Sequence, residues 1–170
     1  MEVRKANTND YTAVCRLLQM GRENIKALGI DQWQNGDPNE KDLQNDIKNG
    51  TLYVVDDGGK LLGMCFIGFY ESDYEHIYWG NWEKGDYAVM HRVAVDTDAR
   101  GKGVFASLIK KATELAKSHG KTQIRIDTHR GNITMQKALK KGDFCRAGVI
   151  YLKNGDERVA FLKKIDKIII

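Results

Sequence analysis

The stretch that decides the fold runs from residue 87 to residue 118 and reads YAVMHRVAVDTDARGKGVFASLIKKATELAKS. Residues 87–95 are apolar on both alternating faces except at His91 and Arg92, which is typical of a strand in the middle of a sheet. Residues 103–118 carry apolar side chains at helical spacing, with lysines outside that stripe. We therefore expect a buried strand that leads through a short turn into an amphipathic helix.

The turn between strand and helix, Arg100-Gly101-Lys102-Gly103, has the chemistry of a phosphate site. Glycine lets the backbone curl and approach a ligand closely. Successive N–H groups at a helix start point toward a phosphate, and the helix dipole and the two cations favour its charge. The turn lacks the Gly-Lys-Ser/Thr of a Walker loop and the third glycine of a dinucleotide fingerprint. Phosphate binding is favoured over the alternative, ordinary charged loop residues.

The remaining segments alternate between strand and helix patterns. Strands are expected at 3–5, 51–56, 60–70, 123–128, 144–152 and 158–165, and helices at 10–28, 39–49 and 132–141. Asp57-Gly58-Gly59 predicts a hairpin, and residues 71–86 form an aromatic, acidic connection. There is no internal repeat or linker composition. The order predicts one α/β (α+β) domain with a mixed sheet flanked by helices.

Composition predicts an ordinary globular chain. Its 170 residues suit one domain with one sizeable core, and 42% are hydrophobic and 29% charged. No apolar run approaches a membrane span, and the start has no secretory pattern. The cysteines, Cys15, Cys65 and Cys145, have the spacing of neither a disulfide framework nor a zinc site. We expect a cytoplasmic protein with no membrane partner.

The charge differs between the two halves of the chain. Residues 1–85 carry 9 basic and 14 acidic residues, whereas residues 86–170 carry 18 and 9, which together give the net charge of +4. A basic half suits an anionic partner and an acidic half suits a cationic one, although both can simply be solvated surface.

The segment HRVAVDTDARGKG resembles the GCN5-related N-acetyltransferase (GNAT) superfamily, in particular its bacterial members. The central motif of that family is Gln/Arg-x-x-Gly-x-Gly/Ala; Arg100 and Gly103 match it, and Phe105 stands where the family prefers a small residue. The resemblance implies acetyl-CoA as cofactor, with its pyrophosphate on the turn and its pantetheine and acetyl group on the preceding strand. The cofactor-binding residues implied are Val93, Ala94, Val95, Arg100, Gly101, Lys102, Gly103, Val104, Phe105 and Asn132.

Asn132 carries a second family feature, an asparagine that opens the next helix and touches the cofactor. It is also an excellent helix cap without any ligand. The family places a tyrosine seven residues later, where this chain has Leu139, so the usual proton donor to the departing thiolate is absent. Asp143-Phe144 stands where the family has Gly-Phe.

The resemblance spans residues 1–163 and implies a mostly antiparallel sheet in one acetyltransferase-like domain, 1–170. Residues 1–85 would form the substrate side and residues 86–164 the cofactor side. The apolar tail, residues 165–170, would pack internally or on a second copy in a homodimer. The reaction implied is direct attack of a primary amine, from a small molecule or a peptide, on the thioester in a ternary complex.

Three residues are candidates for proton transfer. His91 shares an alternation with Val93 and Val95, and is either a satisfied core histidine or a general base. Asp127 ends a strand that should border the active site, and could take the proton through water or position the substrate; local capping of the loop is the alternative. Tyr151 follows the Asn132 helix and could replace the missing acid.

The acidic half supplies the candidate substrate contacts, which are Trp33, Trp79, Trp82 and Glu71. Aromatic and acidic side chains on loops suit a cationic amine, through charge and cation–π attraction. A core or lid role is the default alternative for each tryptophan.

Three other functions stay open on the sequence, one of which, a different nucleotide-binding enzyme, is disfavoured by the missing Walker and dinucleotide patterns. A non-catalytic acyl-CoA-binding domain of the same fold would tolerate the missing tyrosine. A nucleic-acid-binding module would use the basic half, but the aromatic residues do not interleave with the basic ones there, so no nucleic acid is expected. The four histidines have no ligand spacing, and no metal is expected.

Overall fold

The structure, a computed structural model, describes residues 1–166. The strands are β1 (Glu2–Lys5), β2 (Leu52–Asp57), β3 (Lys60–Gly68), β4 (Tyr87–Val95), β5 (Gln123–Thr128), β6 (Cys145–Tyr151) and β7 (Glu157–Lys164). The helices are α1 (Tyr11–Ala27), α2 (Glu40–Asn49), α3 (Val104–Ser118) and α4 (Ile133–Lys141), with short 3-10 turns η1 (Thr8–Asp10), η2 (Ser72–Tyr74) and η3 (Thr97–Ala99). The predicted order of strands and helices is confirmed.

The seven strands form one mixed sheet in the order β1-β2-β3-β4-β5-β7-β6. This confirms the predicted α/β class and the place of β4 in the middle of the sheet. Contacts divide the chain into two compact units. The first unit holds residues 1–67 and 91–111, and the second holds residues 68–90 and the chain from residue 112 onward.

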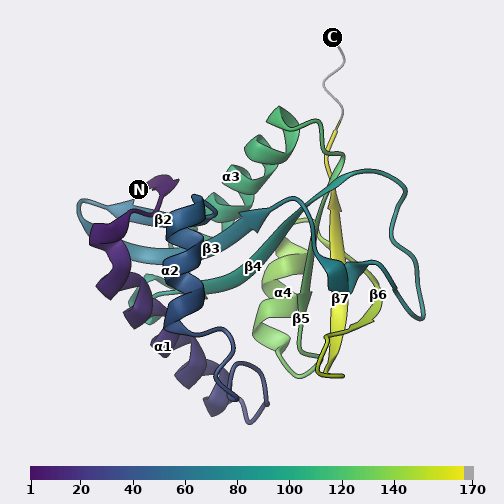
Figure 1. The fold of residues 1–170 in the computed structure, drawn as a ribbon, viewed down its shortest axis with the longest axis horizontal. Helices are drawn as coiled ribbons and strands as arrows, with labels where there is room; N and C mark the ends of the chain where they lie inside the picture. The colour runs from purple at the N-terminus through teal and green to yellow at the C-terminus, as the bar shows by residue number, and fades with distance from the viewer. Residues whose placement is uncertain (167–170) are drawn as a thin grey trace. The chain divides into compact units, whose positions relative to one another are not determined.

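In the first unit, β1, β2 and β3 pair antiparallel, and the Asp57-Gly58 hairpin joins the last two. Helices α1 and α2 run side by side (Figure 1). Their apolar stripes bury side chains against the strands because residues three and four apart share one helix face. The buried core consists of Ala6, Val14, Leu17, Leu18, Leu43, Leu52, Val54, Leu61, Met64 and Ala94.

In the second unit, the start of β4 pairs parallel with β5 over residues 87–89 and 123–125. β5 then pairs antiparallel with β7, and β7 with β6. Ile165, just after β7, is buried and its N–H bonds to the Thr122 carbonyl at 2.9 Å. The predicted packing of the tail beyond it falls on residues 167–170, which lie outside the described residues.

Candidate functional site

The turn predicted to bind phosphate lies between η3 and α3. Gly101 and Gly103 both have a left-handed φ of 77°, a conformation that glycine adopts without steric cost. A Cβ at either position would meet no atom of the described chain within 4 Å, so the backbone angle and not crowding requires glycine there. The first backbone bond into α3 is from the Ser107 N–H to the Gly103 carbonyl at 3.0 Å. The N–H groups just before Ser107 are therefore not used by the helix ladder.

The start of α3 sits tightly on the sheet of its own unit. Val104 is buried, and a Cβ at Gly63 of β3 would lie 2.6 Å from its Cγ1 and 3.1 Å from the Ala94 carbonyl oxygen. Glycine at position 63 thus makes room for the first residue of α3. Arg100 and Lys102 remain exposed beside the turn, where their charge is available to an anion.

A buried carboxylate anchors the turn. Asp96, 2% exposed, accepts one bond from the Asp98 N–H at 2.9 Å and another from Arg16 Nη1 at 2.9 Å. Arg16 also donates to the Leu61 carbonyl at 3.1 Å, so α1 and β3 both hold the loop. Burial alone would raise the pKa of Asp96, but the Asp98 N–H and the Arg16 guanidinium outweigh it and lower the pKa.

His91 and residues 93–95 occupy the part of β4 that belongs to the first unit. The His91 ring is half-buried and stacks on Phe66, with 5.8 Å between ring centroids. Arg92 has a left-handed φ of 52°, so the regular alternation that the sequence predicts for His91 is interrupted at the next residue. Val93 and Val95 are half-buried, and Ala94 is buried.

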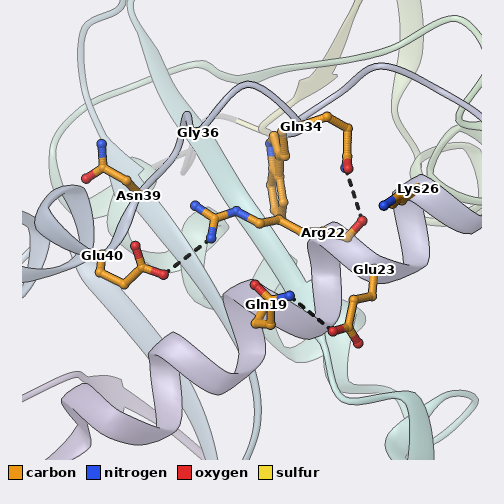
Figure 2. Close-up of a pocket in the computed structure, with 9 residues that line it drawn as sticks. Gln19, Arg22, Glu23, Lys26, Gln34, Gly36, Asn39 and Glu40 are labelled. Atoms are coloured by element: carbon orange, nitrogen blue, oxygen red, sulfur yellow. Dashed lines mark hydrogen bonds and ion pairs between the residues drawn. The ribbon is translucent and has the colours of Figure 1, made fainter.

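A pocket of about 530 Å³ lies between α1 and the loop to α2. Figure 2 shows Arg22 pointing toward Glu40, and the two side chains pair at 3.3 Å. The lining residues are Gln19, Arg22, Glu23, Lys26, Trp33, Gln34, Gly36, Asn39 and Glu40. Trp33 has a left-handed φ of 64°, and its ring covers Gly21, where a Cβ would come within 2.8 Å of it. One predicted substrate contact therefore both packs on the core and lines a polar pocket.

In the second unit, Asp127 lies near the end of β5 and accepts a bond from the hydroxyl of Tyr74 at 2.6 Å. Tyr74 is 2% exposed; burial, followed by the nearby Asp127 carboxylate, raises its pKa well above the usual value. The tyrosine therefore keeps its proton and acts as a donor that orients the half-buried carboxylate.

Trp82 and Glu71 support that part of the fold. The Trp82 Nε1–H donates to the Tyr74 carbonyl at 2.9 Å. Its ring and that of Tyr87 flank the buried Arg125 guanidinium, with centroids 4.5 Å and 4.1 Å from its Cζ. The Glu71 N–H donates to the Tyr87 hydroxyl at 3.2 Å. This framework holds the segment that carries Tyr74.

Trp79 and Tyr151 lie together on the surface of the second unit, with ring centroids 6.4 Å apart. Trp79 is 74% exposed with a left-handed φ of 50°, and Tyr78 packs edge-on against Tyr151 at 5.3 Å. The backbone of Tyr78 bridges to Val149 of β6 through two bonds of 2.8 Å. Trp79, a predicted substrate contact, thus lies beside Tyr151, a predicted acid.

Asn132 caps α4 as its helix-start pattern predicts. Its Oδ1 accepts from the Met135 N–H at 3.1 Å, and the residue is 7% exposed. Leu139, at the position of the family tyrosine, is completely buried in the second unit. His129 closes the preceding loop, because its Nδ1 accepts from the Gly131 N–H at 2.9 Å.

The candidate residues divide between the two units. His91, Trp33, residues 93–95 and the turn residues 100–105 fall in the first unit, and Glu71, Trp79, Trp82, Asp127, Asn132 and Tyr151 fall in the second. Tyr74, Arg16 and Asp96 were not among the site residues predicted from the sequence. Asp96 had a usable signal, because an aspartate directly after a strand and before a loop is a typical cap.

Two features are absent from residues 1–166. None of the helices in this range is long and apolar enough to cross a membrane. The same residues hold no group of three or more His, Cys, Asp or Glu side chains arranged to bind a metal ion.

Comparison with known proteins identifies the family. The sequence model of the Acetyltransferase (GNAT) family matches residues 18–144. The crystal structure of a GNAT-family acetyltransferase from Streptococcus agalactiae has a TM-score of 0.86 and 31% identity, covering 98% of this chain and 96% of that one. The PaiA N-acetyltransferase from Thermoplasma acidophilum, solved in complex with coenzyme A, has the same fold, with a TM-score of 0.74 and 16% identity over 96% of this chain and 98% of that one.

A curated relative matches a shorter stretch. An uncharacterised N-acetyltransferase of Methanocaldococcus jannaschii is 38% identical over 60 residues, which are 35% of this chain and 26% of that protein. This chain thus spans about a quarter of that relative's length in the match. Because the family model covers most of the sequence and the S. agalactiae protein matches almost all of it, the chain belongs to the GNAT acetyltransferase family.

Proposed function

We propose that this protein is an N-acetyltransferase that transfers an acetyl group from acetyl-CoA to a primary amine by direct attack in a ternary complex. The observation that carries the proposal is the turn at the start of α3, with two left-handed glycines, helix N–H groups outside the ladder, and exposed Arg100 and Lys102. This donor set fits the pyrophosphate of coenzyme A, since directed N–H groups and cations stabilise a dianion. When bound, the cofactor supplies the acetyl thioester.

The strand before the turn would hold the rest of the cofactor. Backbone groups of Val93, Ala94 and Val95 would orient the pantetheine arm and the acetyl carbonyl. Most of the acceleration would then come from positioning and from N–H groups directed at the developing oxyanion. Asn132, whose Oδ1 already caps α4, would be a further cofactor contact.

A base must remove a proton from the amine, because an alkyl ammonium with a pKa near 10 cannot attack. Asp127 is the first candidate: its carboxylate is half-buried, and the Tyr74 hydroxyl orients it at 2.6 Å. His91, half-buried on β4, is the second. Tyr151, 36% exposed, is the candidate acid for the leaving thiolate.

The acceptor would be cationic. In the first unit, Trp33 offers an aromatic face to an ammonium group in a pocket that Glu23 and Glu40 also line, although Glu40 pairs there with Arg22. In the second unit, exposed Trp79 offers another aromatic face. Glu71 and Trp82 would act on the acceptor through the loop that they stabilise.

Calorimetric titration with acetyl-CoA tests the cofactor assignment. Micromolar binding, about −8 kcal/mol, is expected for the wild type. Arg100→Ala should weaken it about tenfold, the ordinary worth of one charge-assisted contact. Lys117→Ala, an exposed cation at the far end of α3, is the matched control and should bind within twofold of the wild type. A wild type that binds nothing at millimolar acetyl-CoA overturns the proposal.

A second candidate function is favoured by one observation. Leu139 is completely buried and apolar where the family has its proton-donating tyrosine, so the chain could bind acyl-CoA without catalysis. Detection of free thiol with a panel of primary amines separates the two functions. Amine-dependent thiol release supports the transferase, whereas tight acetyl-CoA binding without release across the panel supports the binding domain.

A further inference from the structure

An ion pair between α2 and the middle of β4 has no part in the proposed cofactor or acceptor contacts. Asp46 of α2 is 6% exposed, and its Oδ2 lies 3.4 Å from Nε of Arg92. Within residues 1–166, neither atom has a hydrogen-bond partner, although both are buried. Buried polar atoms without hydrogen bonds are rare in folded proteins and call for an explanation.

The same arginine has an unusual backbone. Arg92 has a φ of 52° inside a strand. Residues other than glycine avoid this conformation because their Cβ comes too close to the backbone. Its guanidinium also stacks over the Phe66 ring, with Cζ 5.2 Å from the centroid. Strain of this kind persists only where the surroundings hold it, and it concentrates at functional sites.

The strained residue lies directly before the backbone groups proposed to bind the cofactor. Arg92 immediately precedes Val93, the first of the three residues whose backbone would hold the pantetheine arm. If residue 92 relaxed to an ordinary strand conformation, the backbone groups of residues 93–95 would change direction, because φ and ψ are the soft torsions of the backbone and a change in φ reorients the peptide planes that follow.

We propose that Asp46 is a positioning residue: by pairing with Arg92 it holds the left-handed bend in β4 and so directs the backbone of residues 93–95 toward acetyl-CoA. This inference rests on the proposed function for its ligand. The pairing is maintained although burial raises the pKa of Asp46, with Asp42 adding to the effect and Arg92 and His91 opposing it. The site therefore disfavours the charge on which the pairing with Arg92 depends, so the pair adds little to stability.

Glycine at position 92 makes the inference testable. Glycine adopts a positive φ without strain and alanine does not, so Arg92→Gly and Arg92→Ala remove the same guanidinium but differ in the backbone that they permit. We expect Arg92→Gly to bind acetyl-CoA within threefold of the wild type and Arg92→Ala to bind about tenfold more weakly.

The decisive measurement is a double-mutant cycle by calorimetry. Asp46→Asn should weaken acetyl-CoA binding about tenfold in the wild-type background and less than twofold in the Arg92→Gly background, because the bend then needs no support. Asp56→Asn, which removes a carboxylate from the Arg4 ion pair in the same unit, is the matched control and should leave acetyl-CoA affinity unchanged.

A readout without cofactor separates this inference from the proposed function. In the unliganded protein, Asp46→Asn should shift the backbone amide NMR resonances of Val93 and Val95, and Asp56→Asn should not. Equal loss of affinity in both backgrounds, or Val93 and Val95 resonances unmoved by Asp46→Asn, overturns the inference. If the wild type binds no acetyl-CoA, the proposed function fails. The amide resonances of Val93 and Val95 then decide alone whether Asp46 holds the bend in β4.

Discussion

Two buried aspartates of the first unit, Asp96 and Asp46, each lie beside an arginine but differ in electrostatics. Asp96 is 2% exposed and Asp46 is 6% exposed, yet the pKa of Asp96 is lowered and that of Asp46 is raised. Hydrogen bonding explains the difference. Asp96 accepts from Arg16 and from the Asp98 N–H, both at 2.9 Å, whereas Asp46 Oδ2 faces Arg92 at 3.4 Å and has no hydrogen bond to any described residue.

The comparison separates two uses of a buried charge. A carboxylate whose oxygens are satisfied stabilises its surroundings, and Asp96 does so by joining α1, β3 and the loop before α3. A carboxylate that is only near its partner gains little against the cost of leaving water. The first arrangement supports the turn, and the second accompanies a strained backbone in the strand just before it.

The largest effect is expected from Asp96→Ala. This change removes a cap and leaves Arg16 without its carboxylate, which should lower the free energy of unfolding by about 2–3 kcal/mol. Chemical denaturation measures it. Asp98→Ala, which alters an exposed side chain in the same turn, should cost less than about 0.5 kcal/mol. Equal losses for the two variants would mean that the buried bonds of Asp96 add no stability.

A smaller effect of the opposite kind is expected from Asp46→Asn. Because Oδ2 of Asp46 makes no hydrogen bond to a described residue and the folded protein disfavours the charged form, a neutral residue of the same size should leave the free energy of unfolding within about 0.5 kcal/mol of the wild type, or raise it. The same denaturation experiment tests this. A loss above about 2 kcal/mol would show that the pair stabilises the fold, and the contrast between the two aspartates would disappear.

The smallest effect is a difference in pH dependence. The folded pKa of Asp96 lies below its unfolded value, so its contribution to stability is present above the unfolded pKa of about 3.9 and is lost as pH falls through the folded pKa. The folded pKa of Asp46 lies above its unfolded value, so stability rises as pH falls through that folded pKa.

Variants isolate the two titrations. From pH 7 down to pH 3, the stability advantage of the wild type over Asp96→Asn should shrink, whereas its stability relative to Asp46→Asn should increase. If the stability difference between wild type and variant changed with pH in the same way for Asp96→Asn and Asp46→Asn, the opposite pKa shifts assigned to the two aspartates would be wrong.

Local sequence predicted the part of the site that is contiguous in the chain. β4 has the predicted bounds of 87–95, α3 begins within one residue of its predicted start, and Asn132 caps α4. These features depend on residues a few positions apart, so their spacing and capping can be predicted without knowledge of tertiary contacts.

Pairs from distant segments were not predictable in this way. Tyr74 and Asp127 are 53 residues apart, and Arg16 and Asp96 are 80 apart, so no local pattern links them. The alternation expected of His91 failed for a related reason. It assumes a regular strand, and a left-handed residue at position 92 changes the direction of the strand beyond it.

The sequence by itself predicted the order of strands and helices and the glycine turn with its two cations, because these depend on local periodicity, steric freedom and charge, and the motif around that turn carried the resemblance to the family. Only the tertiary structure decided which buried charges are satisfied, where β4 bends, and which carboxylate receives a tyrosine hydroxyl. Those outcomes depend on the packing of segments far apart in the chain, and the free energy of a buried polar group is set by the partners that such packing brings within hydrogen-bond distance.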